Sequence, residues 1–598
     1  MASKANRLQV HMYAYTEFDQ TFIEQRAAQY RDQLNRWQSG ALSEDEFKPL
    51  RLQNGWYVQR FAPMLRVAIP YGVVSSRQLR VLAEIARTYD HKDLSSIDTT
   101  VAGLSDVTSL PDHCAHFTTR QNVQFNWIPL SKSADVMDLL ATAGLHGIQT
   151  SGNCIRNTTT DAFAGIAPDE LVDPRPFAEL IRQWSTLHPE FAFLPRKFKV
   201  AITGASEDRA ATRWHDVGLR LVANDDGDLG FEVSVGGGMG RTPVIGRILR
   251  SFVPAFDILD YLTAVIRVYN RWGRRDNLYK ARIKILVKAE GQAYIDEVDA
   301  EFEALQTVDG SPNRITATRF AEVAAGFSPP SRDQGAIPTQ EKIAAILAAA
   351  SRDEAGFDSW LTQNVRPHKV PHLRAVTLSF KRVGHAPGDA TAAQLDAAAQ
   401  LADTYSAGEL RVTHTQNLVL PWVRCDALPA LWRDAKALGL AKPNIGLLTD
   451  MIACPGGDFC SLANARSLPL ASAITARYQD LDELMDLGAI DLHISGCINS
   501  CGHHHSGHIG ILGVDKDGQE WYQITLAGSD GASIGGEARP GRVVGPSFAA
   551  DEVVGAIEAI LDTYNHLRVR GEAFIATLDR VGHDPFKAAA HQARLATA

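Results

Sequence analysis

Long apolar runs, a signal peptide and an excess of positive charge are all missing from this sequence. No uninterrupted apolar stretch approaches the roughly 20 residues that a membrane-spanning helix needs, and the N-terminal MASKANRLQVHMYAYTEFDQ has no apolar stretch of signal-peptide length. The net charge is −9 and the isoelectric point is near 6.1, which does not favour general nucleic-acid binding. We therefore expect a cytoplasmic protein with neither a membrane nor a nucleic-acid partner.

Cysteine is scarce, and its distribution is informative. The 598 residues include seven cysteines, an odd number, and four of them stand in two close pairs. In a reducing compartment such pairs favour metal ligands over disulfides. Hydrophobic residues make up 45% and charged residues 22%, as in ordinary globular proteins. The length predicts several folded units rather than one core.

A dinucleotide-binding motif is missing too. The glycine-rich stretch GGGMGR, residues 236–241, lacks the strand-turn-helix context and the downstream acid of a dinucleotide fold. We expect no flavin or nicotinamide domain.

Two segments of the chain recur in the same order, which indicates a duplication. TTRQNVQF at residues 118–125 reappears as THTQNLVL at residues 413–420, and FEVSVGGG at 231–238 reappears as YQITLAGS at 522–529. Between the copies, residues 327–356 read as a linker that carries one helix. The copies differ in their charged residues and cysteines, so we expect one specialised site at their junction.

Local patterns predict an α+β protein. Residues 1–60 have apolar residues at helical spacing, followed by a turn at SEDEF, residues 43–47. From about residue 64 to 130, β-rich runs (MLRVAIPYG, HFTTRQNVQFNWI) surround the amphipathic SSRQLRVLAEIARTY, residues 75–89.

The strongest motif is a set of four cysteines. ACPGGDFC contains Cys454 and Cys460, and GCINSCG contains Cys497 and Cys501. Four thiolates are the ligands of a cubane iron-sulfur cluster, and adjacent glycines let the backbone curl so that the sulfurs converge. A structural zinc site, whose paired ligands are usually two to four residues apart, and inert buried cysteines are the alternatives.

These segments resemble the siroheme-dependent sulfite and nitrite reductase family, and the resemblance runs from GWYVQR, near Gly55, to about residue 565. It implies a pseudo-twofold duplicated α+β fold with two ferredoxin-like half-domains and two larger siroheme-binding domains. It also implies siroheme and a 4Fe-4S cluster as cofactors, with Cys454, Cys460, Cys497 and Cys501 holding the cluster and Cys501 bridging to the siroheme iron. Ile498 stands where proline is common in the family.

The implied domains are an N-terminal helical extension (1–60), a first ferredoxin-like half-domain (61–132) and a first reductase domain on the basic side (133–320). A linker (321–365), a second ferredoxin-like half-domain (366–432), a second reductase domain with the cofactor ligands (433–570) and a C-terminal tail (571–598) follow.

The resemblance also places the substrate side chains in the segments TTRQ, NCIRN and LPRKFK, as Arg120, Arg156, Lys197 and Lys199. Each alone could lie on a solvated surface. On a strand, however, positions i and i+2 share one side, so Lys197 and Lys199 would point to one place while Arg196 faces away. Together the four predict a basic cup over the heme.

Several further residues have two interpretations. Gly236, Gly237 and Gly238 form a tight turn or let the backbone approach the cofactor, and residues 267–288, with eight basic residues and one acid, bind siroheme carboxylates or form a solvated helix face. A second metal at His503, His504, His505 and His508 is disfavoured because consecutive residues do not aim at one ion. Cys154, two residues before Arg156, leaves a reactive or modified thiol open.

By resemblance, the chain is expected to be the hemoprotein (beta-component-like) of an assimilatory sulfite reductase, which reduces sulfite to sulfide with six electrons. Nitrite reduction to ammonia and a non-catalytic cofactor-binding scaffold are the alternatives. Lys199, where plant-type nitrite reductases commonly have asparagine, favours sulfite. The electrons are expected from a separate ferredoxin or flavoprotein subunit.

Overall fold

The structure is a computed structural model that describes residues 15–59, 63–92, 111–330, 337–532 and 535–597. Within these ranges no helix is both long and apolar enough to cross a membrane.

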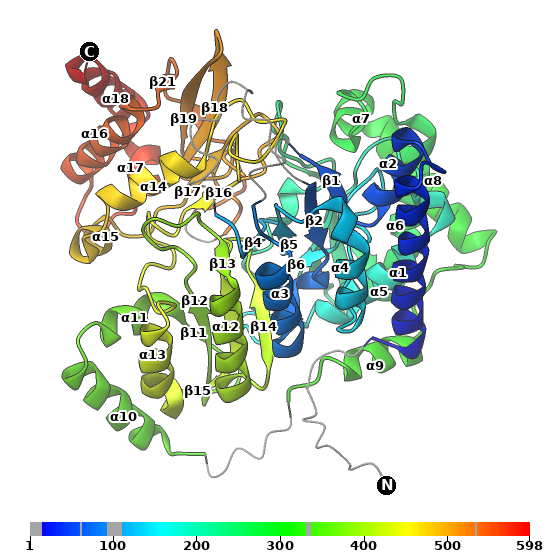
Figure 1. The fold of residues 1–598 in the computed structure, drawn as a ribbon, viewed down its shortest axis with the longest axis horizontal. Coiled ribbons are helices and arrows are strands. Elements are labelled where there is room, and N and C mark those ends of the chain that lie inside the picture. The colour runs from blue at the N-terminus through cyan, green and yellow to red at the C-terminus, as the bar shows by residue number, and fades with distance from the viewer. Residues whose placement is uncertain (1–14, 60–62, 93–110, 331–336, 533–534, 598) are drawn as a thin grey trace.

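Two helices open the described chain, α1 (Glu17–Gln38) and α2 (Glu44–Gln53). The expectation of a turn at SEDEF is wrong, because these residues start α2. Ser43 accepts a hydrogen bond from the Glu46 backbone while the Glu46 carboxylate accepts one from the Ser43 backbone, a capping box that begins a helix. α1 packs against α4 (Ser133–Ala141) at the edge of the molecule (Figure 1).

Two small antiparallel sheets form the centre of the fold. Their strand orders are β1-β2-β5-β4-β13 and β11-β12-β15-β14-β3. The strands of the first sheet are β1 (Trp56–Val58), β2 (Pro63–Val67), β5 (Val123–Phe125), β4 (Cys114–Phe117) and β13 (Asp389–Thr391). Those of the second are β11 (Val365–Pro367), β12 (Leu373–Leu378), β15 (Leu418–Arg424), β14 (Glu409–Val412) and β3 (Val73–Ser75).

Each small sheet therefore takes one edge strand from the other copy. β13 pairs with β4, and β3 pairs with β14, so the main-chain hydrogen bonds of the two copies interlock. The helices that follow the exchanged strands, α3 (Ser76–Thr88) and α12 (Ala392–Tyr405), pack against each other, and one hydrophobic core runs through both sheets. α3 confirms the helix expected at residues 75–89.

Two larger sheets repeat one topology. The first has the order β10-β9-β8-β7-β6 and the second β16-β17-β18-β19-β20, with β21 (Phe548–Ala549) also paired to β19. In both, two parallel pairings are followed by antiparallel ones. The strands are β6 (Thr159–Thr160), β7 (Val200–Thr203), β8 (Val217–Ala223), β9 (Leu229–Val235) and β10 (Arg247–Pro254), then β16 (Ile452–Ala453), β17 (Leu492–Ser495), β18 (Ile509–Lys516), β19 (Gln519–Leu526) and β20 (Arg542–Val543).

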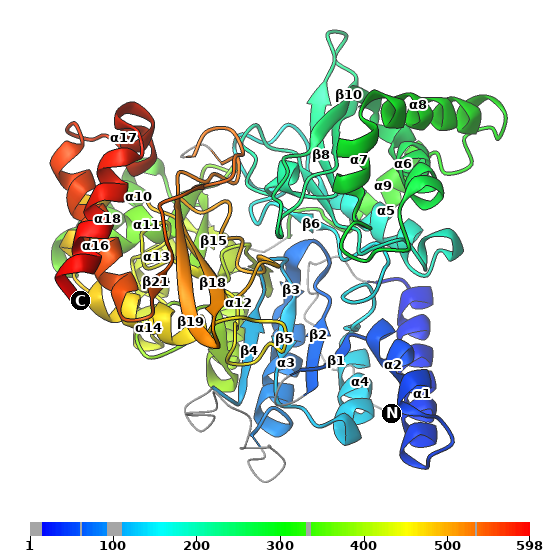
Figure 2. The same cartoon turned by 90° about the horizontal axis from the view of Figure 1, so that it is seen from above.

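The shared topology and pairing confirm the duplication expected from the sequence. In Figure 2 the first large sheet lies at the upper right and the second at the left, with β2 to β5 below and between them. Each has its own hydrophobic core. The first is flanked by α5 (Arg175–Ser185), α6 (Ile258–Trp272), α7 (Ile283–Glu290), α8 (Gln292–Thr307) and α9 (Ala317–Ala325), and the second by α14 (Leu468–Arg477), α15 (Leu481–Leu487), α16 (Glu552–Leu567), α17 (Phe574–Val581) and α18 (Asp584–Thr597).

The linker contributes α10 (Gln340–Asp353), as expected, and is followed by α11 (Phe357–Asn364); α13 (Leu428–Ala437) follows β15. The GGG turn joins β9 to the strand β10 rather than to a helix, so it lies outside a strand-turn-helix context, as the sequence indicated.

Candidate active site

The four cysteines lie in two loops at one edge of the second large sheet. Cys454 directly follows β16, and Cys497 and Cys501 lie in the loop after β17. Because β16 and β17 are parallel neighbours, both loops leave the same edge of the sheet. The Gly496 amide donates a hydrogen bond to Cys454 Sγ (3.2 Å), which joins the two loops.

Two glycines let these loops approach so closely. A Cβ on Gly496 would lie 2.5 Å from the Ala465 carbonyl oxygen and 2.7 Å from the Gly456 Cα, and a Cβ on Gly502 would lie 1.9 Å from the Ile494 carbonyl oxygen. Neither position has room for a side chain. The glycines beside the cysteines therefore allow the two loops, and with them the sulfurs, to come close together, as the sequence predicted.

The thiols share one electrostatic neighbourhood. Burial and, after it, a negative charge on Cys501 raise the pKa of Cys454 to about 12. Burial also raises the pKa values of Cys460 and Cys497, and again Cys501 adds to the effect. Cys501 itself is exposed at the end of the loop. Such sulfurs ionise readily only when a positive metal centre binds them.

A single metal ion and a cubane cluster need different spacings between their ligands. Among the described residues, no three histidine, cysteine or acidic side chains converge as they would around one metal ion, the geometry that structural zinc requires. A cubane cluster spreads four thiolates around a larger body.

The predicted basic residues come together in the first copy. Arg120 lies in the turn between β4 and β5, only 9% exposed, and donates hydrogen bonds to the Asn157 carbonyl (2.7 Å) and to Thr159 Oγ1 (3.1 Å). Lys197 and Lys199 immediately precede β7. Phe198 between them is fully buried and bridges Ile155, so the two lysines share the opposite side, as expected.

The ammonium groups of these lysines lack partners. Within the described part of the chain, neither makes a side-chain hydrogen bond or an ion pair. Burial and neighbouring cations lower the pKa of Lys197 to about 8, and burial followed by Lys197 and Arg120 places the pKa of Lys199 well below its usual value. Burial also lowers the pKa of Arg120 to about 9. Of the four residues expected to form the basic cup, Arg120, Lys197 and Lys199 influence one another most strongly, and the name is kept below for these three. Their positive charges repel one another, and a bound anion would reduce that repulsion.

Arg156 lies beside the basic cup but is engaged with its own loop. Its guanidinium donates to the carbonyls of Thr150 (2.6 Å) and Gly152 (2.8 Å), while its charge still contributes to lowering the pKa of Lys197. The structure thus brings all three predicted segments together, with Arg156 already hydrogen-bonded at their edge.

The basic cup and the cysteine loop meet across the junction of the two copies. Thr119, next to Arg120, donates a hydrogen bond from Oγ1 to the Cys501 carbonyl (2.8 Å). His505 Nε2 contacts the Gly240 carbonyl at 2.9 Å, and a negative charge on Cys501 raises the pKa of Lys197 against the effect of burial. The site expected at the junction therefore combines cations from one copy with thiols from the other.

The three glycines after β9 pack against protein atoms. A Cβ on Gly236 would lie 2.9 Å from the Val287 side chain, and one on Gly237 would lie 2.3 Å from the Arg213 carbonyl oxygen. A Cβ on Gly238 would lie 2.7 Å from Arg282 Nη2. The turn therefore needs glycine for close packing, and Gly238 lets a cation lie against its backbone.

Sequence reasoning did not single out Arg282, Lys284 or Asp216. Arg282 precedes α7 and has a buried Nε with no hydrogen-bond partner, while Lys284 donates to the Met239 and Thr242 carbonyls (2.6 and 2.7 Å). Both belong to the basic segment 267–288, so the clustering of basic residues there already pointed to them as candidates for binding siroheme carboxylates. Asp216 had no such signal, because a lone aspartate before a strand is common.

Cys154 and the histidines that follow Cys501 have few polar contacts. Cys154 Sγ donates to the Ser151 carbonyl (3.2 Å), and burial raises the pKa of this thiol. His504 is fully buried, and neither of its ring nitrogens has a hydrogen-bond partner. No metal-binding group includes the histidines among the described residues.

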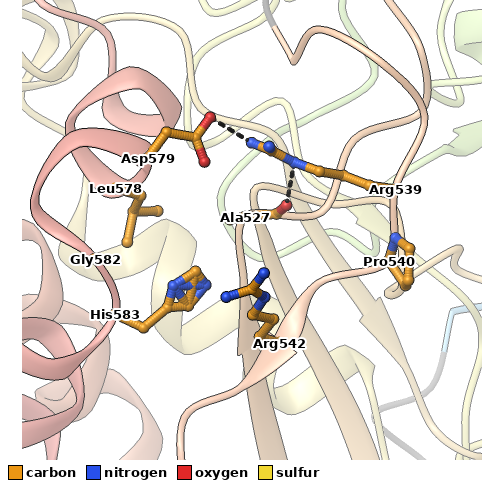
Figure 3. A pocket seen from close by; sticks show the side chains of 8 residues that line it. All are labelled: Ala527, Arg539, Pro540, Arg542, Leu578, Asp579, Gly582 and His583. Carbon is orange, nitrogen blue, oxygen red and sulfur yellow. Dashed lines mark hydrogen bonds and ion pairs between the residues drawn. The ribbon is translucent and has the colours of Figure 1, made fainter.

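A separate cavity of about 200 Å³ lies beside β20 and α17 (Figure 3). In it Arg539 is paired with Asp579 (2.7 Å) and also donates to the Ala527 carbonyl (3.0 Å). It contains none of the cysteines or basic residues above, so it is not part of the junction site.

Comparisons with known proteins agree with the geometry. The family model described as "Nitrite and sulphite reductase 4Fe-4S domain" matches residues 151–303 and 447–597, and "Nitrite/Sulfite reductase ferredoxin-like half domain" matches residues 377–438. The solved structure of "Mycobacterium tuberculosis NirA protein" superposes with a TM-score of 0.71 at 23% identity, over 95% of this chain and 97% of that one, which shows a common fold.

Three characterised relatives illustrate the range of names. The chloroplastic ferredoxin–nitrite reductase of Arabidopsis thaliana is 29% identical over 83% of this chain and 75% of its own length, and the ferredoxin–nitrite reductase of Synechococcus elongatus is 30% identical over 80% and 82%. Sulfite reductase [ferredoxin] 2 of Mycolicibacterium paratuberculosis is 26% identical over 88% and 83%.

Proposed function

Because the chain belongs to the nitrite and sulphite reductase family, whose members are oxidoreductases that carry siroheme and a 4Fe-4S cluster, we propose that it reduces sulfite to sulfide. The six electrons come one at a time from a ferredoxin. The observation that carries this proposal is the unpaired Lys199 ammonium in a basic cup that faces the cysteine loop.

The residues present fit both cofactors. Four thiols at one sheet edge match a cubane cluster, and Cys501, exposed toward the basic cup, is suited to bridge to siroheme. On the opposite side, Arg282, whose Nε has no hydrogen-bond partner among the described residues, offers a cation to a carboxylate-rich macrocycle. When bound, the siroheme and the 4Fe-4S cluster would supply the electron transfer.

The side chains of the protein itself bind the oxyanion, orient it and supply protons to it. Arg120 is fixed by the Asn157 carbonyl and the Thr159 hydroxyl, so its guanidinium offers a rigid set of donors to an oxyanion. Lys197 and Lys199, which have no competing acceptors among the described residues, supply mobile ammonium donors. Because burial and neighbouring cations lower their pKa values, they can also release protons to a reduced substrate more readily than an exposed lysine.

Lys199 favours sulfite over nitrite. Sulfite has three oxygens and up to two negative charges, whereas nitrite has two oxygens and one charge, so an additional ammonium group helps the larger anion more. The relatives from Mycolicibacterium paratuberculosis with sulfite reductase in their names support this choice.

Nitrite reduction to ammonia is the second candidate. The relatives from Arabidopsis and Synechococcus, at 29% and 30% identity, are named nitrite reductases, and the basic cup suits that anion as well.

A ferredoxin is the preferred donor over a flavoprotein subunit. The relatives named above are all ferredoxin enzymes by name, and the turn after β9 leads to a strand, so it is not a nucleotide-binding turn. The donor would deliver electrons to the cysteine side of the junction.

Steady-state kinetics of the purified holoenzyme test the proposal. With reduced methyl viologen and then with reduced ferredoxin, kcat/KM is measured for sulfite and for nitrite. A higher value for sulfite supports the proposal, and a much higher value for nitrite replaces it with the second candidate. Protein that holds both cofactors but reduces neither anion would be a non-catalytic scaffold.

A further inference from the structure

One carboxylate is buried among the cations of the junction site. Asp216, immediately before β8, has a fully buried side chain. Its Oδ2 accepts a hydrogen bond from the Lys199 backbone amide (3.0 Å), and its Oδ1 accepts one from Arg282 Nη2 (2.6 Å). Its own carbonyl accepts from Gly236 (2.9 Å), so one residue connects the lysine segment, the cation before α7 and the glycine turn.

The duplication shows that the fold does not need a carboxylate here. Val217 pairs with Val200 in the first copy as Ile509 pairs with Leu492 in the second, so His508 occupies the position of Asp216 and Asp491 that of Lys199. In the second copy His508 Nε2 lies 3.6 Å from the Asp491 carboxylate, and His508 Nδ1 accepts a hydrogen bond from the Asp491 backbone amide (3.2 Å). Because a histidine accepts from the same backbone amide in the second copy, this position needs a hydrogen-bond acceptor but not a carboxylate. The negative charge of Asp216 therefore serves the cations around it, Arg282 first among them.

Those cations repel one another at close range. The charged and titratable groups that face Lys199 are Lys197, Arg120, Arg282, His215, His503 and Asp216. Among these groups Asp216 is the one acid, and burial lets each unbalanced charge act strongly on its neighbours.

We propose that Asp216 is a positioning residue of the basic cup, which fixes the Lys199 backbone and the Arg282 guanidinium and supplies the negative charge that lets these cations stand together as charged donors. The proposal rests on the proposed function for its substrate, a small oxyanion, but the contacts of Asp216 do not depend on which oxyanion is bound.

The charges around Lys199 predict in which direction its pKa changes when Asp216 is replaced. Burial, Lys197, Arg120 and Arg282 all lower the pKa of Lys199, and Asp216 is the group that raises it. With Asp216 neutralised, Lys199 would lose its proton at a lower pH. Since the charged form binds the anion, the alkaline limb of kcat/KM would move to lower pH, by about one pH unit for the loss of an opposite charge at this range.

The experiment compares the wild-type holoenzyme with Asp216→Asn and Asp216→Glu. We expect the alkaline limb to move to lower pH in Asp216→Asn and to return toward the wild-type position in Asp216→Glu, with siroheme absorption and iron content recorded for each. Replacing Lys199 by arginine in the Asn variant should remove the shift caused by Asp216→Asn and leave the limb that Lys197 sets near pH 8, because a guanidinium stays protonated.

Glu179→Gln is the matched control. Glu179 on α5 is a fully buried carboxylate paired with Arg182 at 2.6 Å, outside the junction site. Loss of the Glu179 charge should lower the stability of the fold without moving the alkaline limb of kcat/KM. An unmoved limb in Asp216→Asn, or the same movement in Glu179→Gln, would overturn the proposal.

Competitive acetylation with acetic anhydride gives a measurement that does not need turnover. The labelling of Lys199 against pH, followed by mass spectrometry of its peptide in cofactor-loaded protein, should show an earlier rise in Asp216→Asn. If the wild type reduces neither anion, this labelling still decides the role of Asp216. Should the Asn variant not fold, Arg282→Gln should move the Lys199 labelling curve to higher pH, because a repelling cation is lost; movement to lower pH would overturn the proposal.

Discussion

Replacing Lys199 by asparagine should separate the two candidate substrates. The ammonium has no partner within the described residues, so its removal leaves no buried acceptor stranded and the change reports mainly on the anion. A charge-assisted hydrogen bond contributes about 1.5 to 3 kcal/mol. At about 1.4 kcal/mol for each factor of ten, the loss is roughly tenfold or more for sulfite.

The loss for nitrite should be much smaller, because Arg120 and Lys197 remain to balance its single charge and asparagine can still donate a neutral hydrogen bond. The assay is kcat/KM for each anion with reduced methyl viologen, at one pH, on protein of equal siroheme and iron content. Lys288→Asn, which removes an exposed lysine of α7, is the control and should change neither value. Equal losses for both anions would refute the charge argument, as would a wild type that strongly prefers nitrite.

Three other outcomes follow from the site. The purified protein should contain about four non-heme irons and one heme iron per chain by elemental analysis and visible absorption, and stoichiometric zinc would contradict the cluster assignment. Cys501→Ser should abolish the cluster absorption whereas Cys425→Ser, at a buried thiol that lies 3.8 Å from the Pro371 carbonyl, should leave the spectrum unchanged; equal spectra would contradict the ligand assignment. Activity should fall as the pH rises through about 8, the pKa to which burial and neighbouring cations bring Lys197, because the ammonium that binds the anion is lost; a rate that keeps rising to pH 10, nearer the usual lysine pKa, would show that Lys197 is not needed in its charged form.

The sequence identified the chemistry of the site better than its architecture. Cysteines and clustered basic residues are rare enough to stand out, and α3 has a strong helical periodicity with a capping box at Ser75. The alternation around Phe198 also placed Lys197 and Lys199 on one side, although regular strand structure begins only at Val200. Local spacing carries this kind of information.

The strand exchange and the role of Asp216 could not be predicted from the sequence, because both depend on contacts between segments that are far apart in the chain. The exchange of β3 and β13 between copies depends on pairings more than 250 residues apart in the sequence, which no local pattern specifies. Asp216 is an unremarkable acid until Lys199 and Arg282 are placed around it. The start of α2 was missed for a different reason, because the Ser43 and Glu46 pair was present as a capping box but was interpreted as a turn.

The strand exchange explains why a site can be divided between two copies and still be rigid. β13 of the second copy hydrogen-bonds to β4, and the turn that follows β4 contains Thr119 and Arg120. Thr119 then holds the Cys501 carbonyl, so the cations and the thiols are connected through backbone pairing rather than through a flexible contact between domains. Each copy could therefore diverge in charge, one toward cations around Asp216 and the other toward cysteines, without loosening the junction. A duplicated fold with separate sheets would have had to maintain that geometry by side-chain packing alone, which is a weaker constraint on the sub-ångström placement that a redox site needs.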